Sequence, residues 1–158
     1  MDEGGGRLLP GASGMTFLVC EDGSEYTDRF TRFLGGQFRF ARAGHFAEAL
    51  ALAPGAAALL LDLDFRRLQR ELLVDERGTP DVRAAAEVQG ILILRALRSR
   101  GVGLPAILFA DLDDASHAAR LQAELAPLWI LPSSEGLPRV AQLLREVVSS
   151  ATGSVAKS

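Results

Sequence analysis

Two continuous apolar runs in this chain stop on acidic residues. The first is residues 15–20 (Met-Thr-Phe-Leu-Val-Cys), followed by Glu21 and Asp22, and the second is residues 57–61 (Ala-Ala-Leu-Leu-Leu), followed by Asp62. Runs of this kind are typical of parallel strands buried on both faces. Ligands of open parallel sheets bind outside the carboxyl ends of the strands. If these two strands are neighbours, three carboxylates meet there, where they would bind a hard cation or raise their own pKa values.

The composition indicates one folded domain. The chain has 158 residues, of which 48% are hydrophobic, and a net charge of −3. This charge leaves no electrostatic footprint for nucleic acid, and no apolar run approaches the length of a membrane span. The single cysteine, Cys20, lies within the first apolar run and fits a reducing compartment. The N-terminus carries Asp2 and Glu3 and lacks the apolar core of a signal peptide. We therefore expect a bacterial, cytoplasmic protein that binds neither nucleic acid nor membrane.

Strand-like and helix-like segments alternate along the chain. The expected strands are residues 16–20, 37–41, 57–61, 104–110 and 128–131. The expected helices begin at Ser24 and at about residues 46, 82, 115 and 137. Five such units with short connections predict a three-layer α/β fold whose five-stranded parallel sheet has the flavodoxin-like order 2-1-3-4-5.

The segment between the third strand and the third helix is the exception to these short connections. Residues 65–81 form an insertion that combines a helix-prone basic stretch with turn residues around Gly78 and Pro80. Connections of this length are uncommon in compact domains and are usually functional or disordered. We expect a domain over residues 15–148, with the insertion outside its core. Residues 1–14 and 149–158 are expected to be a flexible N-terminus and a flexible tail.

Taken in order, four segments resemble a response-regulator receiver domain of the CheY-like family. Residues 19–22 (Val-Cys-Glu-Asp) match the acidic pair that closes the first receiver strand. Residues 59–63 (Leu-Leu-Leu-Asp-Leu) match the strand that carries the phosphoacceptor aspartate. Residues 90–98 (Gly-Ile-Leu-Ile-Leu-Arg-Ala-Leu-Arg) are similar to the third receiver helix, and residues 104–110 to the fourth strand. The resemblance covers nearly all of the predicted domain.

The resemblance implies roles for the three carboxylates. Glu21 and Asp22 would hold Mg²⁺ together with Asp62, and Asp62 would attack a phosphoryl donor. A cation there would screen the repulsion between carboxylate and phosphate. With two carboxylates beside Asp62, we expect no cofactor other than weakly bound Mg²⁺.

The other half of the receiver site is missing from the sequence. The family places a Ser or Thr after the fourth strand, and here that position is Ala110. The family's lysine after the fifth strand falls on Pro132 or Ser133, and the only lysine of the chain is Lys157. The groups that read the phosphate are therefore absent, which is typical of an atypical receiver, or pseudo-receiver.

Simpler readings of the acidic residues remain open. Asp62 could be a relic or cap a neighbouring turn, and the pair Glu21 and Asp22 could cap the first helix, where acid is favoured. The sequence Asp62-Leu63-Asp64 also resembles the opening of haloacid-dehalogenase-type phosphatases, whose first Asp is the nucleophile. That family normally begins with this strand, whereas two strand–helix units precede it here.

The hypothesis favoured by the sequence is a signalling domain, not an enzyme, that binds a protein partner or a second copy of itself independently of phosphorylation. A receiver phosphorylated on Asp62 with Mg²⁺ is the alternative, and a small Mg²⁺-dependent phosphatase is a third. The candidate binding residues lie in the insertion and on the fifth strand: Arg66, Arg67, Leu68, Arg70, Leu72, Leu73 and Trp129. Leu68, Leu72 and Leu73 would share one helical face.

Overall fold

The computed structural model describes residues 15–68, 72–79 and 85–157. Its sheet has five parallel strands in the order β2-β1-β3-β4-β5, as predicted. The strands are β1 (Thr16–Cys20), β2 (Arg39–Ala43), β3 (Ala58–Asp62), β4 (Ala106–Phe109) and β5 (Leu128–Leu131). Each strand overlaps its predicted range; β1, β3 and β5 begin within one residue of the expected start, and β2 and β4 begin two residues later than expected.

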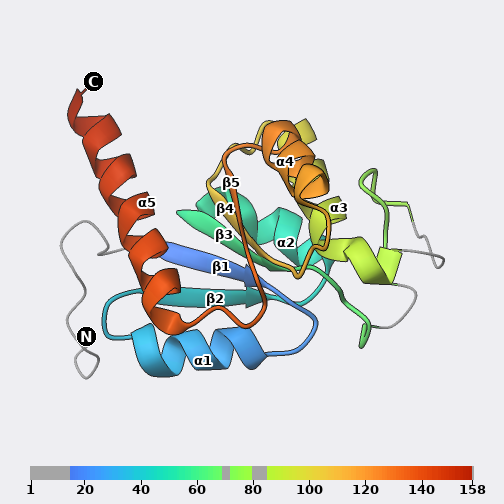
Figure 1. Cartoon of the computed structure of the whole chain (residues 1–158), viewed down its shortest axis with the longest axis horizontal. Helices are drawn as coiled ribbons and strands as arrows, with labels where there is room; N and C mark the ends of the chain where they lie inside the picture. The colour runs from blue at the N-terminus through green and yellow to red at the C-terminus, as the bar shows by residue number, and fades with distance from the viewer. Residues whose placement is uncertain (1–14, 69–71, 80–84, 158) are drawn as a thin grey trace.

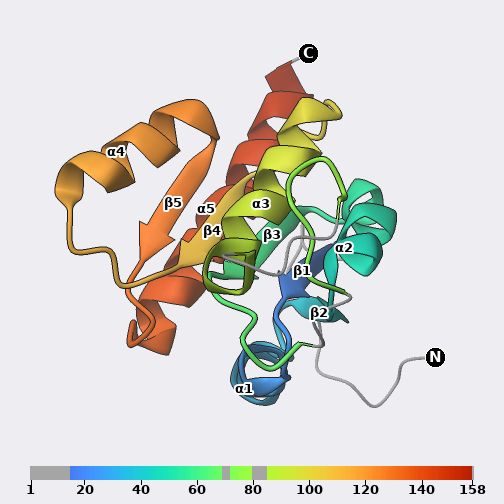
Figure 2. The same ribbon diagram turned by 90° about the vertical axis from the view of Figure 1, so that its right-hand side faces the viewer.

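Helices cover both faces of the sheet (Figures 1 and 2). They are α1 (Glu25–Leu34), α2 (Phe46–Leu52), followed by the 3-10 turn η1 (Ala53–Gly55), α3 (Ala85–Ser99), α4 (Ala115–Glu124) and α5 (Leu137–Lys157). Successive strand residues point to opposite faces, so Leu18 and Leu59 pack in the core with α2 and α3, whereas Val19 and Leu60 pack in the core with α1 and α5. Two cores therefore hold the sheet between the helical layers.

The C-terminal segment differs from the prediction of a flexible tail over residues 149–158. Residues 149–157 continue α5, which runs past the sheet in Figure 1. The predicted flexible segment 1–14 lies outside the described residues. Among the residues that are described, no helix is both long enough and apolar enough to cross a membrane.

The insertion is built into the core, contrary to the expectation that residues 65–81 lie outside it. Phe65 is fully buried and Leu73 is only 4% exposed, and both belong to the core on the α2 and α3 side of the sheet. The described residues 65–68 and 72–79 contain turns and no α-helix. Leu68 is half-buried, Leu72 is exposed and Leu73 is buried, and residues 69–71 of the predicted helical stretch lie outside the described residues.

Two polar contacts fix the end of the insertion. The buried Gln89 side chain donates to the carbonyl of Val74 at 2.7 Å and accepts from its N–H at 3.1 Å. The Asp75 carboxylate accepts the backbone N–H groups of Arg77 and Thr79, both at 2.9 Å, and so closes a turn. These bonds satisfy backbone groups that a loop would otherwise leave to solvent.

Gly90 allows α3 to approach the end of β3. Its N–H donates to the carbonyl of Leu63 at 3.0 Å, and a Cβ at this position would collide with the carbonyl oxygen of Asp62. Close backbone approach of this kind is a general reason for glycine. This close contact fixes the position of the end of β3, where Asp62 lies, relative to α3.

Candidate acidic site at the carboxyl edge of the sheet

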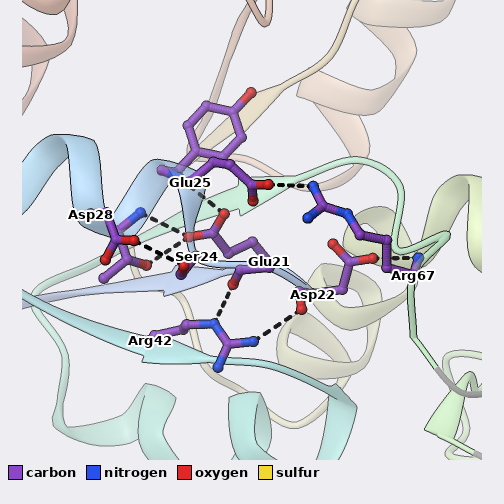
Figure 3. A network of polar contacts seen from close by, with 10 residues as sticks. Glu21, Asp22, Ser24, Glu25, Asp28, Arg42 and Arg67 are labelled. Carbon is purple, nitrogen blue, oxygen red and sulfur yellow. Dashed lines mark hydrogen bonds and ion pairs between the residues drawn. The ribbon is translucent and has the colours of Figure 1, made fainter.

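The two strands that end on acid are direct neighbours. Strands β1 and β3 pair in parallel with Cys20 opposite Leu61. Glu21 and Asp22 therefore follow β1 at the same edge where Asp62 ends β3, as the sequence predicted. Figure 3 shows the polar network that surrounds the first two residues.

Glu21 is a buried helix cap. Its side chain is 1% exposed, and its two carboxylate oxygens accept the N–H groups of Tyr26 at 3.1 Å and Thr27 at 2.8 Å. The Thr27 hydroxyl donates to the same carboxylate at 2.7 Å. These N–H groups lie in the first turn of α1, where unpaired donors and the helix dipole favour an anion. Ser24, the expected cap, makes no side-chain capping bond. Glu21 therefore caps the first helix, which is one of the alternatives left open by the sequence.

Asp22 and Glu25 are engaged by Arg67 from the insertion (Figure 3). The backbone N–H of Arg67 donates to Asp22 Oδ2 at 2.6 Å, and the guanidinium of Arg67 lies 2.6 Å from Glu25 Oε2. Backbone hydrogen bonding, together with this contact, holds the pKa of Glu25 below its usual value. The insertion therefore brings a positive charge to the acidic edge.

Arg42 holds the backbone of the same loop from the other side. Its guanidinium, which projects from β2, donates to the carbonyls of Gly23 and Asp22, the latter at 3.1 Å. Two arginines therefore hold the loop that carries Asp22. Arg42 binds its carbonyl oxygens, and Arg67 binds the side chains of Asp22 and Glu25.

Asp62 lies half-buried at the end of β3. Burial raises its pKa to about 7, with further contributions from the negative charges of Asp64, Asp22 and Glu21, while a backbone hydrogen bond from Leu63 opposes the shift. A carboxyl with this pKa is partly protonated at neutral pH, and the protonated form is not a nucleophile. The repulsion expected among the carboxylates contributes to the raised pKa of Asp62, but burial is the larger cause of the shift.

Tyr26 faces the same edge from α1. Its ring stacks on Phe109 with a centroid distance of 4.8 Å. Burial raises the pKa of the Tyr26 hydroxyl to about 12, and the negative charges of Asp62, Glu21 and Asp111 add to the shift. The hydroxyl therefore stays protonated and faces an acidic environment.

The opposite half of the edge has no hydroxyl on β4 and no cation on β5. Ala110 is buried, and the next residue, Asp111, accepts the Ser133 N–H at 3.0 Å and the Ser133 hydroxyl at 2.5 Å. These two bonds hold the pKa of Asp111 below its usual value. The Ser133 hydroxyl is therefore already hydrogen-bonded to the Asp111 carboxylate. Pro132 and Ala110 both line a cavity of about 390 Å³.

The carboxylates do not fit the Mg²⁺ that the resemblance implies. Among the described residues, no group of three or more His, Cys, Asp or Glu side chains is arranged so that it could hold a metal ion. Glu21 is turned under α1, and Asp22 already accepts an N–H from Arg67. Glu21, Asp22 and Asp62 therefore share an edge of the sheet without forming the expected ligand set.

The candidate partner-binding residues differ in how far they are exposed to solvent. Arg66, Arg67 and Leu72 are exposed, whereas Leu68 and Trp129 are half-buried and pack against the two cores. Leu73 is buried and has no surface to offer a partner. Arg70 lies outside the described residues.

Several functional contacts escaped the sequence reasoning because they join distant residues. Arg67 meets Asp22 across 45 positions, and Ser133 meets Asp111 across 22. No local pattern marks such pairs. The sequence predicted turns in the insertion, but it did not indicate which side chains the insertion would bring to the acidic edge.

Sequence comparison identifies no relatives of the chain: no protein-family model matches it, and none of the curated proteins is significantly similar. Structural comparison is informative. The receiver domain of the Francisella response regulator 1452 superposes with a TM-score of 0.65 at 16% identity, over 87% of this chain and 98% of that chain. A response-regulator receiver domain protein from Clostridium thermocellum gives 0.62 at 14% identity, over 87% of this chain and 97% of that chain.

A third similar structure is an adenylate cyclase from Rhodopirellula baltica, with a TM-score of 0.64 at 11% identity, over 91% of this chain and 94% of that chain. At these identities the likeness concerns the fold. Together with the strand order and the position of Asp62, it shows that this chain has the fold of a response-regulator receiver domain.

Proposed function

We propose that the chain is a pseudo-receiver, a bacterial, cytoplasmic signalling domain that acts by binding a protein partner independently of phosphorylation. One observation carries this proposal: the chain's own groups engage the carboxylates of Glu21 and Asp22, while Ala110 and Ser133 supply neither a free hydroxyl nor a cation on the other side of Asp62. The proposed module uses no cofactor and carries out no enzymatic turnover.

Charge is the physical reason against phosphoryl transfer. A phosphoryl group on Asp62 would add negative charge beside Asp64, Asp22 and Glu21, and catalysis of this transfer depends on positioning and electrostatic stabilisation. The family's lysine position is Pro132 or Ser133, and Asp111 brings one more negative charge to that side. A receiver that is phosphorylated slowly on Asp62 remains the competing hypothesis.

Partner binding is supported by the form of the insertion. Buried Phe65 and Leu73 anchor it, and Gln89 fixes its end, so that Arg66 and Leu72 are exposed on an ordered base. Ordered loops on rigid scaffolds are frequent binding elements. The proposed binding surface, called here the insertion surface, consists of Arg66, Arg67, Leu68 and Leu72. The half-buried Trp129 on β5 is a second, separate candidate, and a second copy of the chain is an alternative partner.

Beryllofluoride with Mg²⁺, a mimic of phosphoaspartate, separates this proposal from its alternatives. Compared with Mg²⁺ alone, we expect beryllofluoride to cause no further change in the amide NMR signals around residues 21–22 and 62. Saturable shifts that appear there and are absent in Asp62→Asn would favour the phosphorylatable receiver. Turnover of a generic phosphomonoester that is lost in Asp62→Asn would favour the phosphatase.

Affinity capture with the domain as bait tests the insertion surface. The double substitution Arg66→Glu and Leu72→Glu should abolish capture of a partner that the wild-type domain and Asp62→Asn retain equally. Phe33→Ser, on α1, is the matched control, because Phe33 is exposed but lies outside the insertion surface. Loss of capture in Asp62→Asn, or equal loss in the Phe33 control, would contradict the proposal.

A further inference from the structure

The insertion supplies a cation to the acidic edge. The Arg67 side chain is 66% exposed and that of Glu25 61%, yet the guanidinium and the carboxylate approach to 2.6 Å. The N–H of the same residue donates to Asp22 Oδ2 at 2.6 Å. One residue therefore contacts two carboxylates of the loop between β1 and α1, and Figure 3 shows Arg67 extending across this loop.

The Arg67 contacts lie beside the carboxyl end of β1, and the neighbouring strand β3 ends at the same edge. This is the region where the resemblance places Mg²⁺ and where the carboxylates do not form a ligand group.

We infer that Arg67 is an internal counter-cation that takes the place of a divalent ion at the acidic edge, and that the contacts of Arg67 with Asp22 and Glu25 exclude such an ion. An ion bound by Asp22 would compete with the Arg67 N–H for Oδ2, and an ion near Glu25 would repel the guanidinium. Binding of an ion and closure of the Arg67 contacts are thus mutually exclusive. By linkage, each weakens the other by the same factor.

The size of the effect follows from the exposure of the pair. Exposed ion pairs are weak because solvent and salt screen them, so that loss of the guanidinium should strengthen binding of Mg²⁺ at this edge by roughly 1.4-fold to fivefold. The inference concerns the charge balance of the edge and does not depend on whether the insertion surface binds a partner.

The test is a Mg²⁺ titration of four proteins, followed by the amide NMR signals of residues 21–25 and 62–67. The proteins are the wild type, Arg67→Gln, Arg67→Lys and Arg66→Gln. Arg67→Lys retains the positive charge, and Arg66→Gln removes the same charge from an exposed neighbour that makes no ion pair with the described residues.

We expect the half-saturating Mg²⁺ concentration to be roughly 1.4-fold to fivefold lower in Arg67→Gln than in the other three proteins. High Mg²⁺ should also speed hydrogen exchange at the Arg67 amide of the wild type, because the bond to Asp22 is displaced. Equal gains in Arg67→Gln and Arg66→Gln would reduce the effect to net charge and overturn the inference. An unchanged titration in Arg67→Gln would overturn it as well.

Discussion

Leu72 and Leu73 are adjacent leucines in the insertion, and the structure predicts opposite consequences for their truncation. Leu73 is 4% exposed within the core, whereas Leu72 is 36% exposed. Truncation of a buried leucine to alanine typically costs about 2–5 kcal/mol, because it removes apolar contacts and leaves a cavity. Leu73→Ala should therefore lower the free energy of unfolding by about 3 kcal/mol. Leu72→Ala should lower it by about 1 kcal/mol, since its site is open to solvent.

Equilibrium unfolding in urea measures both losses. With a slope of about 2 kcal/mol per molar urea, the midpoint should fall by about 1.5 M in Leu73→Ala and by about 0.5 M in Leu72→Ala. Unchanged slopes would show that the transition remains two-state and that stability alone has changed. Equal midpoint shifts, or a loss below about 1 kcal/mol in Leu73→Ala, would refute the assignment of the insertion to the core.

Three further predictions concern the polar contacts of the domain. Glu21→Ala should destabilise it by about 1–2 kcal/mol in urea unfolding through loss of the α1 cap, whereas Ser24→Ala, which removes no capping bond, should change little. Gln89→Leu leaves the backbone groups of Val74 unpaired, and should cost about 1–3 kcal/mol and speed hydrogen exchange at Val74. The folded-state pKa of Asp62 is raised from 3.8 to about 7. Folding therefore favours the protonated carboxyl, and the domain loses stability as the pH rises from about 4 through 7, because the folded state must then hold Asp62 ionised. Asp62→Asn should therefore raise the melting temperature at pH 8, with a gain that shrinks towards pH 4; a gain independent of pH would contradict this linkage.

Much of the fold was predictable because the strands are continuous apolar runs. Phe17 to Cys20 and Ala58 to Leu61 are buried throughout, which only a sheet covered on both faces provides. The alternation of strands with helices then confines the topology to a few orders. The length of α5 was not predictable in the same way, because the small polar residues after Ser149 resemble a linker.

The insertion shows where local patterns fail. Its leucines and arginines have helical spacing, but burial of Phe65 and Leu73 and the pairing of Gln89 with Val74 stabilise a different conformation. These contacts are tertiary, and tertiary context overrides a weak helical preference.

The position of the acidic site was predictable, but its state was not. The ends of β1 and β3 fix Glu21 and Asp62 at one edge. Whether those carboxylates are free depends on partners elsewhere in the chain. Arg67, whose role no spacing rule marks, engages Asp22 from the start of the long connection that follows β3. The missing hydroxyl at Ala110, by contrast, could be read directly from the sequence.

The central claim, that Asp62 no longer serves as a phosphoacceptor, is tested most directly by intact-mass spectrometry after incubation with acetyl phosphate and Mg²⁺. The wild-type domain and Asp62→Asn should give the same mass distribution, with no phosphorylated species in either, because the positions after β4 and β5, Ala110 and Pro132 or Ser133, supply neither the free hydroxyl nor the lysine that would hold the phosphoryl group. A phosphorylated species in the wild type that is lost in Asp62→Asn would contradict the claim.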